Sequence, residues 1–217
     1  MINEVFITGG TGYIGSRLVS VLMKKNFPVS ALVRNSSEEK LPEKVNVVFG
    51  NALDASTFAD KIPPSKIFIH MIGVAHPGPR KKQQFIDVDL KSIQQSVTAA
   101  KDKGIEHFIY ISVAPSDIMK DYSDVRMQGE KLIYESFSRA TFIRPFYVLG
   151  PAHYWPLLLT PLFKILSLSK SGREKAKRLG LVWIGQMVNA LVWAVENPAH
   201  GIRILEVKDI KKFPKKY

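Results

Sequence analysis

The chain has no cysteine among its 217 residues, and its 19 acidic residues are outnumbered by 31 lysines and arginines. Without cysteine, neither a disulfide framework nor thiolate chemistry is possible, which is compatible with a reducing compartment. The first apolar segment, Val5–Thr8, begins too close to the first residue to leave room for a signal peptide. We therefore expect a cytoplasmic protein.

A long hydrophobic run is also missing. The longest apolar stretch, residues 155–169, is interrupted by Lys164 and contains Pro156 and Pro161. It is shorter than the roughly 20 apolar residues that span a bilayer. The stretch favours a buried helix that covers part of a nucleotide-binding domain, and a helix lying on a membrane surface is the alternative.

Acidic residues are scarce in three short stretches, which carry most of the net charge of +12 at pH 7: Arg80–Lys82, residues 170–178 and residues 208–217. Residues 155–178 and the basic tail predict contact with an acidic partner or a membrane surface, and solvated surface is the alternative. No nucleic-acid partner is expected, because no helix-turn-helix, zinc-finger or aromatic RNA-binding pattern accompanies the charge. The five histidines lack metal-ligand spacing, so no metal site is expected.

A glycine-rich turn lies between an apolar run and a segment with helical spacing. Its residues are Thr8, Gly9, Gly10, Thr11, Gly12, Tyr13, Ile14 and Gly15. A dinucleotide pyrophosphate needs a tight turn, backbone without bulky side chains, and a helix N-terminus with free N–H groups. We therefore predict that these eight residues bind the cofactor. A glycine-rich surface loop without a ligand is the alternative.

Apolar, β-rich runs alternate with helical segments along most of the chain. The expected strands are Val5–Thr8, Val29–Val33, Val45–Phe49, Ile67–Ile72, His107–Ser112, Thr141–Arg144 and Ile202–Val207, and the expected helices are Gly12–Lys25, Phe85–Lys103 and Val125–Ser138. This alternation predicts one α/β domain over residues 1–217, a Rossmann-like doubly wound parallel sheet. Residues 150–181, broken by prolines, are expected to form a lid or a substrate-side insertion.

The residue that follows the second expected strand indicates which dinucleotide binds. An NAD-binding protein has a carboxylate about 20 residues beyond the glycine turn, whereas this chain has Arg34, 19 residues after Gly15. A guanidinium suits a 2′-phosphate through forked hydrogen bonds, and Arg17 adds a second positive charge. NADP is therefore favoured over NAD. Alternatively, Arg34 stacks on adenine, which would allow either cofactor.

Two further strand ends supply candidate cofactor contacts. Asn51, next to Ala52, can both donate and accept hydrogen bonds at the adenine edge. Asp54 is expected to be the N-cap of the next helical turn. Gly73 follows the fourth expected strand, where a glycine allows the backbone to approach the cofactor. A plain turn glycine is the alternative.

Together these features resemble a short-chain dehydrogenase/reductase of the extended or atypical, epimerase-like kind. The resemblance rests on Thr8-Gly9-x-x-Gly12-x-x-Gly15, Arg34, Gly50-Asn51-x-x-Asp54, the strand ending at Ser112, and Arg144-Pro145 leading to Gly150-Pro151. It implies a Rossmann fold, a nicotinamide cofactor and, in many members, hydride transfer at a carbon that bears oxygen. The short length resembles the atypical branch, which includes reductases, epimerase-like proteins and inactive nucleotide-sensing regulators.

The resemblance also implies a catalytic set of Ser, Tyr and a Lys four residues after the Tyr. Here the matching residues are Ser112, Tyr122 and Arg126, so arginine replaces the lysine. A cation one helical turn away makes a tyrosine more acidic, but an arginine does not readily release a proton. Glu130 is expected to pair with Arg126 and orient it. Alternatively, Tyr122 and Arg126 only anchor the cofactor or cap a helix.

Two functions follow from this set. The first is an NADP-dependent reductase or epimerase-like enzyme that acts on a small carbonyl or aromatic substrate, with Tyr122 as the acid and Ser112 orienting the carbonyl. The second is a non-catalytic protein that senses NADP(H) or assists the assembly of a complex. Ser112 and Tyr122 favour the enzyme, and Arg126 favours the binding protein.

Overall fold

The computed structural model describes residues 4–34, 37–78, 80–154 and 179–217. Seven parallel strands form one sheet in the order β3-β2-β1-β4-β5-β6-β9. Their bounds are β1 Val5–Thr8, β2 Val29–Val33, β3 Asn46–Phe49, β4 Ile67–His70, β5 His107–Ile111, β6 Ala140–Arg144 and β9 Ile202–Glu206. The predicted Rossmann-like sheet is confirmed.

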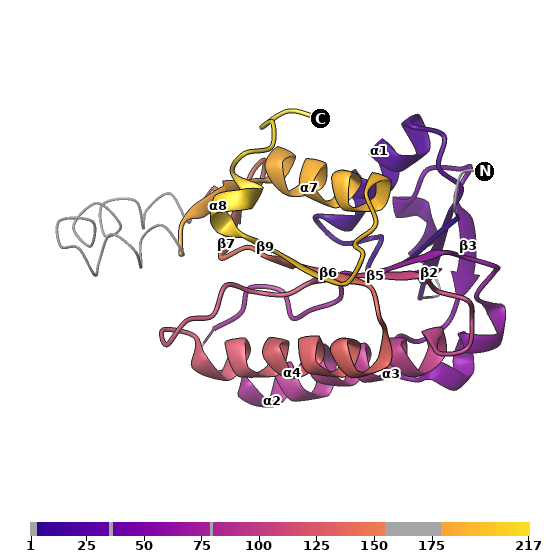
Figure 1. The fold of residues 1–217 in the computed structure, drawn as a ribbon, viewed down its shortest axis with the longest axis horizontal. Coiled ribbons are helices and arrows are strands. Elements are labelled where there is room, and N and C mark those ends of the chain that lie inside the picture. The colour runs from indigo at the N-terminus through magenta and orange to yellow at the C-terminus, as the bar shows by residue number, and fades with distance from the viewer. Residues whose placement is uncertain (1–3, 35–36, 79, 155–178) are drawn as a thin grey trace, which may run out of the picture.

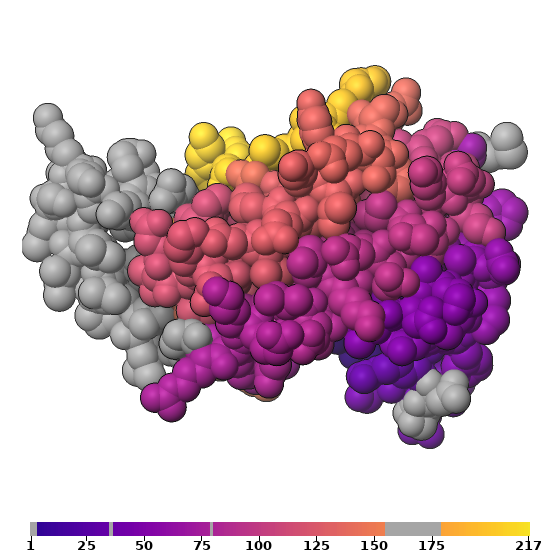
Figure 2. Space-filling view, turned by 90° about the horizontal axis from the view of Figure 1, so that it is seen from below, coloured from indigo at the N-terminus to yellow at the C-terminus, as the bar shows by residue number. Residues whose placement is uncertain are grey.

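Helices cover both faces of the sheet (Figure 1). One face carries α1 (Gly15–Lys24), α7 (Ile184–Glu196) and the short α8 (Val207–Ile210). The other carries α2 (Lys82–Gln84), α3 (Lys91–Ala100) and α4 (Lys120–Ser136). Figure 2 views the molecule from this second side, where the side chains of α3 and α4 hide the sheet.

Two apolar clusters fill the space between the sheet and its helices. On the α1–α7 side, Val5 and Ile7 of β1 pack in one cluster with Leu18 and Leu22 of α1. On the α3–α4 side, aromatic rings of neighbouring strands pack side by side. The ring centroids of Phe68 on β4 and Phe108 on β5 are 4.9 Å apart. Alternate residues of a strand face opposite sides, so these apolar strands are buried on both faces, as a parallel sheet requires.

Several predicted bounds are corrected by the structure. The expected helix over 85–103 is a π-helix, Phe85–Leu90, followed by α3, and α4 begins at Lys120 rather than at 125. Helix α7 and a second, two-stranded parallel sheet of β7 (Tyr147–Leu149) and β8 (Leu181–Trp183) were not predicted from the sequence. Most of the expected lid, residues 155–178, lies outside the described residues.

Short 3-10 turns, Glu38–Lys40, Ala55–Thr57 and Ala59–Lys61, connect β2 to β3 and β3 to β4. In the sheet, β1 has β2 on one side and β4 on the other. The carboxyl ends of β1 and β4 therefore flank the point where the strand order reverses, which is where doubly wound proteins bind their ligands.

Candidate functional site

The glycine turn after β1 is closed by its own backbone. Gly9 has φ +80°, and a Cβ there would lie 2.9 Å from the carbonyl carbon of Met71. The N–H of Gly12 donates to Gly9 O at 3.1 Å, and a Cβ on Gly15 would overlap the same oxygen. A side chain at Gly9 or Gly15 would therefore push apart the turn, α1 and the end of β4.

The N-terminus of α1 carries a positive charge and has no side-chain cap in the described ranges. Its N-cap residue, Ile14, makes no side-chain cap hydrogen bond, and the first turn has no acidic residue. Arg17 adds a positive charge there: its Nη1 donates to Tyr13 O at 2.7 Å and its guanidinium lies 4.2 Å from the Tyr13 ring centroid. Free N–H groups and the helix dipole favour an anion at this position, so the turn fits a dinucleotide pyrophosphate.

The other predicted cofactor residues lie on the same edge of the sheet. Arg34 is exposed directly after β2, and Asn51 is exposed after β3, next to the partly buried Ala52. Asn51 Oδ1 accepts the N–H of Leu53 at 3.0 Å within the turn. Asp54 Oδ1 accepts the N–H of Ser56 at 3.1 Å, which confirms its predicted N-cap role.

Thr8 and His70 form a buried polar link between β1 and β4. Thr8 Oγ1 lies 2.8 Å from His70 Nδ1, which also lies 3.0 Å from Ser96 Oγ, while Ser92 Oγ lies 3.3 Å from Nε2. The hydroxyl of Thr8 thus faces the interior. Burial, followed by the charge of Arg126, lowers the pKa of His70 well below its usual value. A neutral imidazole holds these strand ends together, a role that the sequence analysis did not foresee.

Arg126 lies inside the protein, where it pairs with Asp89 of the π-helix. Its Nη2 lies 2.6 Å from Asp89 Oδ1, with the side chains 5% and 0% exposed. Its Nη1 donates to Ile111 O at 3.0 Å and to Tyr110 Oη at 3.4 Å. Asp89 was not among the predicted site residues, because its pairing with Arg126 arises only when α4 and the π-helix pack together.

Gly73 provides the space for this pair. A Cβ at Gly73 would overlap Nη2 of Arg126 and lie 3.0 Å from Asp89 Oδ1. The sequence suggested two reasons for glycine here, a close approach of the backbone to the cofactor or a plain turn. Neither involves a contact with another side chain of the protein. The structure adds a third reason for glycine at this position, which is the close approach of the Arg126 guanidinium.

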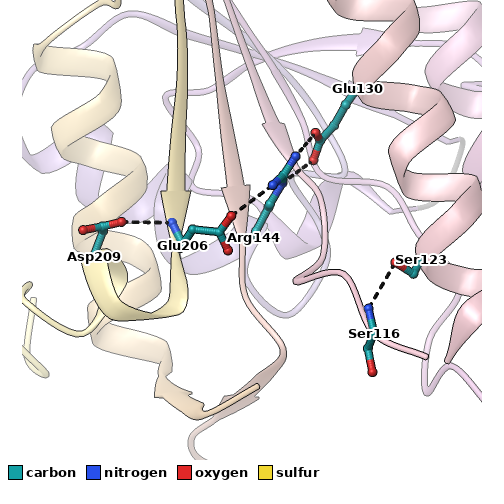
Figure 3. A network of polar contacts seen from close by, with 6 residues as sticks. All are labelled: Ser116, Ser123, Glu130, Arg144, Glu206 and Asp209. Carbon is teal, nitrogen blue, oxygen red and sulfur yellow. Dashed lines mark hydrogen bonds and ion pairs between the residues drawn. The ribbon is translucent and has the colours of Figure 1, made fainter. Parts of the chain in front are cut away.

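The predicted pair between Arg126 and Glu130 is wrong. Glu130 accepts hydrogen bonds from Arg144 instead, at 2.9 Å from Nε and 2.6 Å from Nη2, and Arg144 Nη1 reaches Glu206 at 3.0 Å (Figure 3). Although Glu130 is four residues from Arg126, the two guanidinium groups belong to different networks. Arg144 joins α4, β6 and β9, and among the residues that the structure describes Asp89 is the carboxylate paired with Arg126.

Tyr122 lies on α4 beside a pocket and next to Arg126. The pocket is lined by Pro77, Val113, Ala114, Ser116, Met119, Tyr122, Ser123, Phe146 and Tyr147. Ser116 N–H donates to Ser123 Oγ at 3.4 Å, which joins the loop after β5 to α4 at this pocket (Figure 3). The Arg126 guanidinium lies 5.2 Å from the Tyr122 ring centroid. Burial raises the pKa of Tyr122, although Arg126 opposes the shift.

Ser112 follows the last residue of β5, Ile111, and immediately precedes two of the pocket residues, Val113 and Ala114. It is 2% exposed, and its N–H donates to Ile143 O at 2.8 Å. Its Oγ has no hydrogen-bond partner among the residues that the structure describes. A buried hydroxyl without a partner is costly, so Ser112 retains the capacity to donate to a ligand oxygen.

This fold and edge arrangement define a protein of the epimerase-like short-chain dehydrogenase/reductase class, as the motifs predicted. The family model for the NmrA-like family matches residues 1–170, and the chain belongs to that family. It is 23% identical over 218 residues to a ceramide reductase of Caulobacter vibrioides, covering 96% of this chain and 65% of the relative. It is 25% identical over 139 residues to a 3-beta-hydroxysteroid dehydrogenase of Mycolicibacterium neoaurum, covering 61% of this chain and 37% of the relative.

Solved structures show the same fold. The enzyme WbmH of Bordetella bronchiseptica in complex with NAD+ matches with a TM-score of 0.70 and 20% identity, covering 94% of this chain and 75% of that one. A UDP-glucose 4-epimerase structure matches with a TM-score of 0.70 and 17% identity, covering 97% and 80%. The chain spans less than two thirds of the length of the 3-beta-hydroxysteroid dehydrogenase and of the ceramide reductase.

In the described ranges, no helix is long and apolar enough to cross a membrane. Nor do these ranges contain three His, Cys, Asp or Glu side chains grouped so as to hold a metal ion.

Proposed function

We propose that the protein binds NADP(H) and transfers hydride to or from a small substrate with a carbonyl or alcohol group on an apolar or aromatic body. One observation carries this proposal: the uncapped N-terminus of α1 follows a closed glycine turn at the switch point of the sheet. The NAD named with the related structures is consistent with a pyridine dinucleotide at this edge.

The preference for NADP rests on charge at the end of β2. Arg34 is exposed at the position where an NAD-binding protein places a carboxylate, and Arg17 lies on the first turn of α1. A guanidinium binds a 2′-phosphate by charge-assisted hydrogen bonds, which the 2′-hydroxyl of NAD does not match. Asn51 and Ala52, after the neighbouring strand, lie where the adenine is expected.

The pocket beside Tyr122 supports a substrate with an uncharged body. None of the nine described lining residues carries a charge, and all but Ser116 and Ser123 have a side chain that is apolar or aromatic. When bound, the cofactor supplies the hydride. Ser112 donates a hydrogen bond to the substrate carbonyl oxygen, and the phenol of Tyr122 holds the proton that this oxygen receives.

A non-catalytic NADP(H)-sensing or complex-assembly protein is the second candidate. The observation in its favour is that Arg126, which replaces the lysine of active relatives, is buried and paired with Asp89. An arginine in this state does not pass a proton to solvent. A protein that only senses NADP(H) would bind the cofactor but would not reduce any carbonyl substrate.

Contact with an acidic partner or an anionic membrane surface stays part of the proposal. Residues 155–178 lie outside the described residues. The described tail packs on the fold: Asn189 Nδ2 donates to Pro214 O at 3.0 Å and to Lys216 O at 2.9 Å, and Lys215 Nζ lies 5.3 Å from the Trp183 ring centroid. Lys208, Lys211, Lys212, Lys215 and Lys216 nevertheless remain exposed.

Cofactor titration tests the proposed preference. Wild-type protein is expected to bind NADPH more tightly than NADH, and Arg34→Glu is expected to weaken NADPH binding by about tenfold to a hundredfold, as loss of a charge-assisted contact implies. Lys44→Glu is the matched control, because Lys44 is exposed before β3, at the opposite edge of the sheet. An unchanged preference in Arg34→Glu would refute the role of Arg34.

Turnover separates the two candidates. NADPH oxidation is followed with a panel of quinones, flavins and aldehydes, using wild type and Tyr122→Phe. The enzyme predicts turnover that falls at least about tenfold without the phenol. Equal rates in both proteins would remove Tyr122 as the acid, and no turnover with tight NADPH binding would favour the sensor.

A further inference from the structure

Asp89 meets Arg126 in a part of the site that the proposed reaction does not use. The carboxylate lies on the π-helix Phe85–Leu90, a backbone form that is rare and is often found at functional sites. Its Oδ2 accepts the N–H of Val74 at 3.0 Å, and its Oδ1 lies 2.6 Å from Arg126 Nη2. Each carboxylate oxygen therefore has one partner, Val74 for Oδ2 and Arg126 of α4 for Oδ1.

The Arg126 guanidinium lies near two phenol rings. Its central carbon is 5.2 Å from the Tyr122 ring centroid and 5.7 Å from that of Tyr110. Its Nη1 is bound to Ile111 O and Tyr110 Oη, and Gly73 leaves room for Nη2. The guanidinium is thus held in one place, close enough to Tyr122 for its charge to act on the phenol.

Asp89 opposes that charge. A carboxylate in contact with the guanidinium leaves a buried pair with no net charge, and the field of such a pair at the phenol is much weaker than that of a lone cation. Arg126 favours the Tyr122 anion, whereas Asp89 and burial disfavour it. The pKa of Tyr122 is raised accordingly, with burial as the largest cause. The pKa of Tyr110, which also contacts the guanidinium, is raised to about 12 for the same leading reason.

We propose that Asp89 is a positioning residue that fixes Arg126 and offsets part of its charge at Tyr122, so that Tyr122, which is also buried, serves the site as a protonated hydrogen-bond donor and not as a tyrosinate base. The inference rests on the proposed function for the identity of the site, but the protonation of Tyr122 can be measured without any substrate. It makes the reductive direction, in which the substrate oxygen receives a proton, the one for which the site is built.

The phenolate absorbance of Tyr122 tests the proposal. It is obtained as the difference between the alkaline titrations of wild type and Tyr122→Phe, with circular dichroism at each pH to report folding. In folded wild type we expect Tyr122 to ionise only above the ordinary value of about 10. Ionisation of Tyr122 below that value would overturn the proposal.

Charge variants then isolate Asp89, each paired with its own Tyr122→Phe version. Asp89→Asn leaves the cation uncompensated, so the Tyr122 transition should fall by at least about one pH unit. Asp87→Asn is the control, because Asp87 is exposed on the same π-helix, and it should not move the transition. A transition in folded Asp89→Asn that matches wild type would contradict the proposal.

The double variant Asp89→Asn/Arg126→Gln provides the test if Asp89→Asn does not fold, because it removes both charges and leaves no lone buried ion. Partial offset predicts a Tyr122 transition no lower than that of wild type, because the removed cation acts on the phenol more strongly than the removed carboxylate. A Tyr122 transition more than about one pH unit below that of wild type would overturn the proposal. These spectra stand apart from turnover, so a failed reductase assay with the expected spectra would overturn the proposed function alone.

Discussion

Arg144 and Glu130 form a two-point ion pair, with Nε to Oε1 at 2.9 Å and Nη2 to Oε2 at 2.6 Å. Their side chains are 15% and 8% exposed, so the pair is largely shielded from solvent. Arg144 also reaches Glu206 at 3.0 Å. One guanidinium thereby joins the middle of α4 to the ends of β6 and β9. Helix α4 also carries Tyr122.

Loss of this pair should reduce stability. We expect Glu130→Gln to lower the free energy of unfolding by about 2 to 4 kcal/mol, because it weakens two charge-assisted bonds and leaves Arg144 partly unpaired. Glu135→Gln is the control. Glu135 lies on the same helix with its side chain 55% exposed, and its Oε1 is 3.8 Å from Lys131 Nζ. This substitution should lower the free energy of unfolding by less than about 0.5 kcal/mol. Urea unfolding measures both. Equal losses in the two variants would contradict the assigned role of Arg144.

Gly73→Ala tests the close packing around Arg126. The added methyl group would overlap Arg126 Nη2, which cannot retreat without breaking its bonds to Asp89 and Ile111. We expect a loss of about 1 to 3 kcal/mol in the free energy of unfolding. Gly201→Ala, where no atom of the described residues lies within 4 Å of the new methyl carbon, should be close to neutral. If Gly73→Ala is as stable as Gly201→Ala, the guanidinium is not held where the structure places it.

His107 should make stability depend on pH. Burial, followed by the charges of Arg203 and Arg139, lowers its pKa from 6.5 to about 4. The unfolded chain therefore binds this proton near pH 6.5 and the folded protein only near pH 4, so stability is lost as the pH falls through that window. The contribution of His107 is about 3 kcal/mol by pH 4.

The measurement is the difference in unfolding free energy between pH 7 and pH 4.5, by urea titration. His107→Gln removes the proton and should flatten the dependence relative to wild type. His200→Gln, with an exposed side chain, is the control. A pH dependence in His107→Gln as steep as in wild type would show that His107 does not stay neutral in the folded protein.

The strands and the glycine turn were predictable because local sequence determines them. Val5–Thr8 and Val29–Val33 are bounded by turn residues and are apolar on both faces, and the structure reproduces both ranges. Asp54 was identified as an N-cap because its side chain acts two residues away in the sequence. Helix α7 was missed because it is apolar on nearly all sides and so lacks the alternation of buried and exposed positions that marks a surface helix.

The partners of the charged residues could not be predicted in the same way. Spacing places Glu130 one turn after Arg126, yet the fold brings Asp89 to Arg126 and Arg144 to Glu130. An exposed pair of this spacing contributes only a few tenths of a kcal/mol, so packing of α4 against the π-helix and β6 decides the pairing. Sequence distance alone does not contain that information.

Calorimetric titration with NADPH and NADH tests most directly whether the glycine turn binds the pyrophosphate of a pyridine dinucleotide. We expect NADPH to bind to wild type and to Gly201→Ala. We expect binding at least about tenfold weaker in Gly12→Ala, whose exposed methyl group would occupy the phosphate side of the turn, 3.2 Å from Gly9 O. Heat of binding with neither coenzyme, or equal affinity in Gly12→Ala and Gly201→Ala, would contradict pyrophosphate binding at the turn.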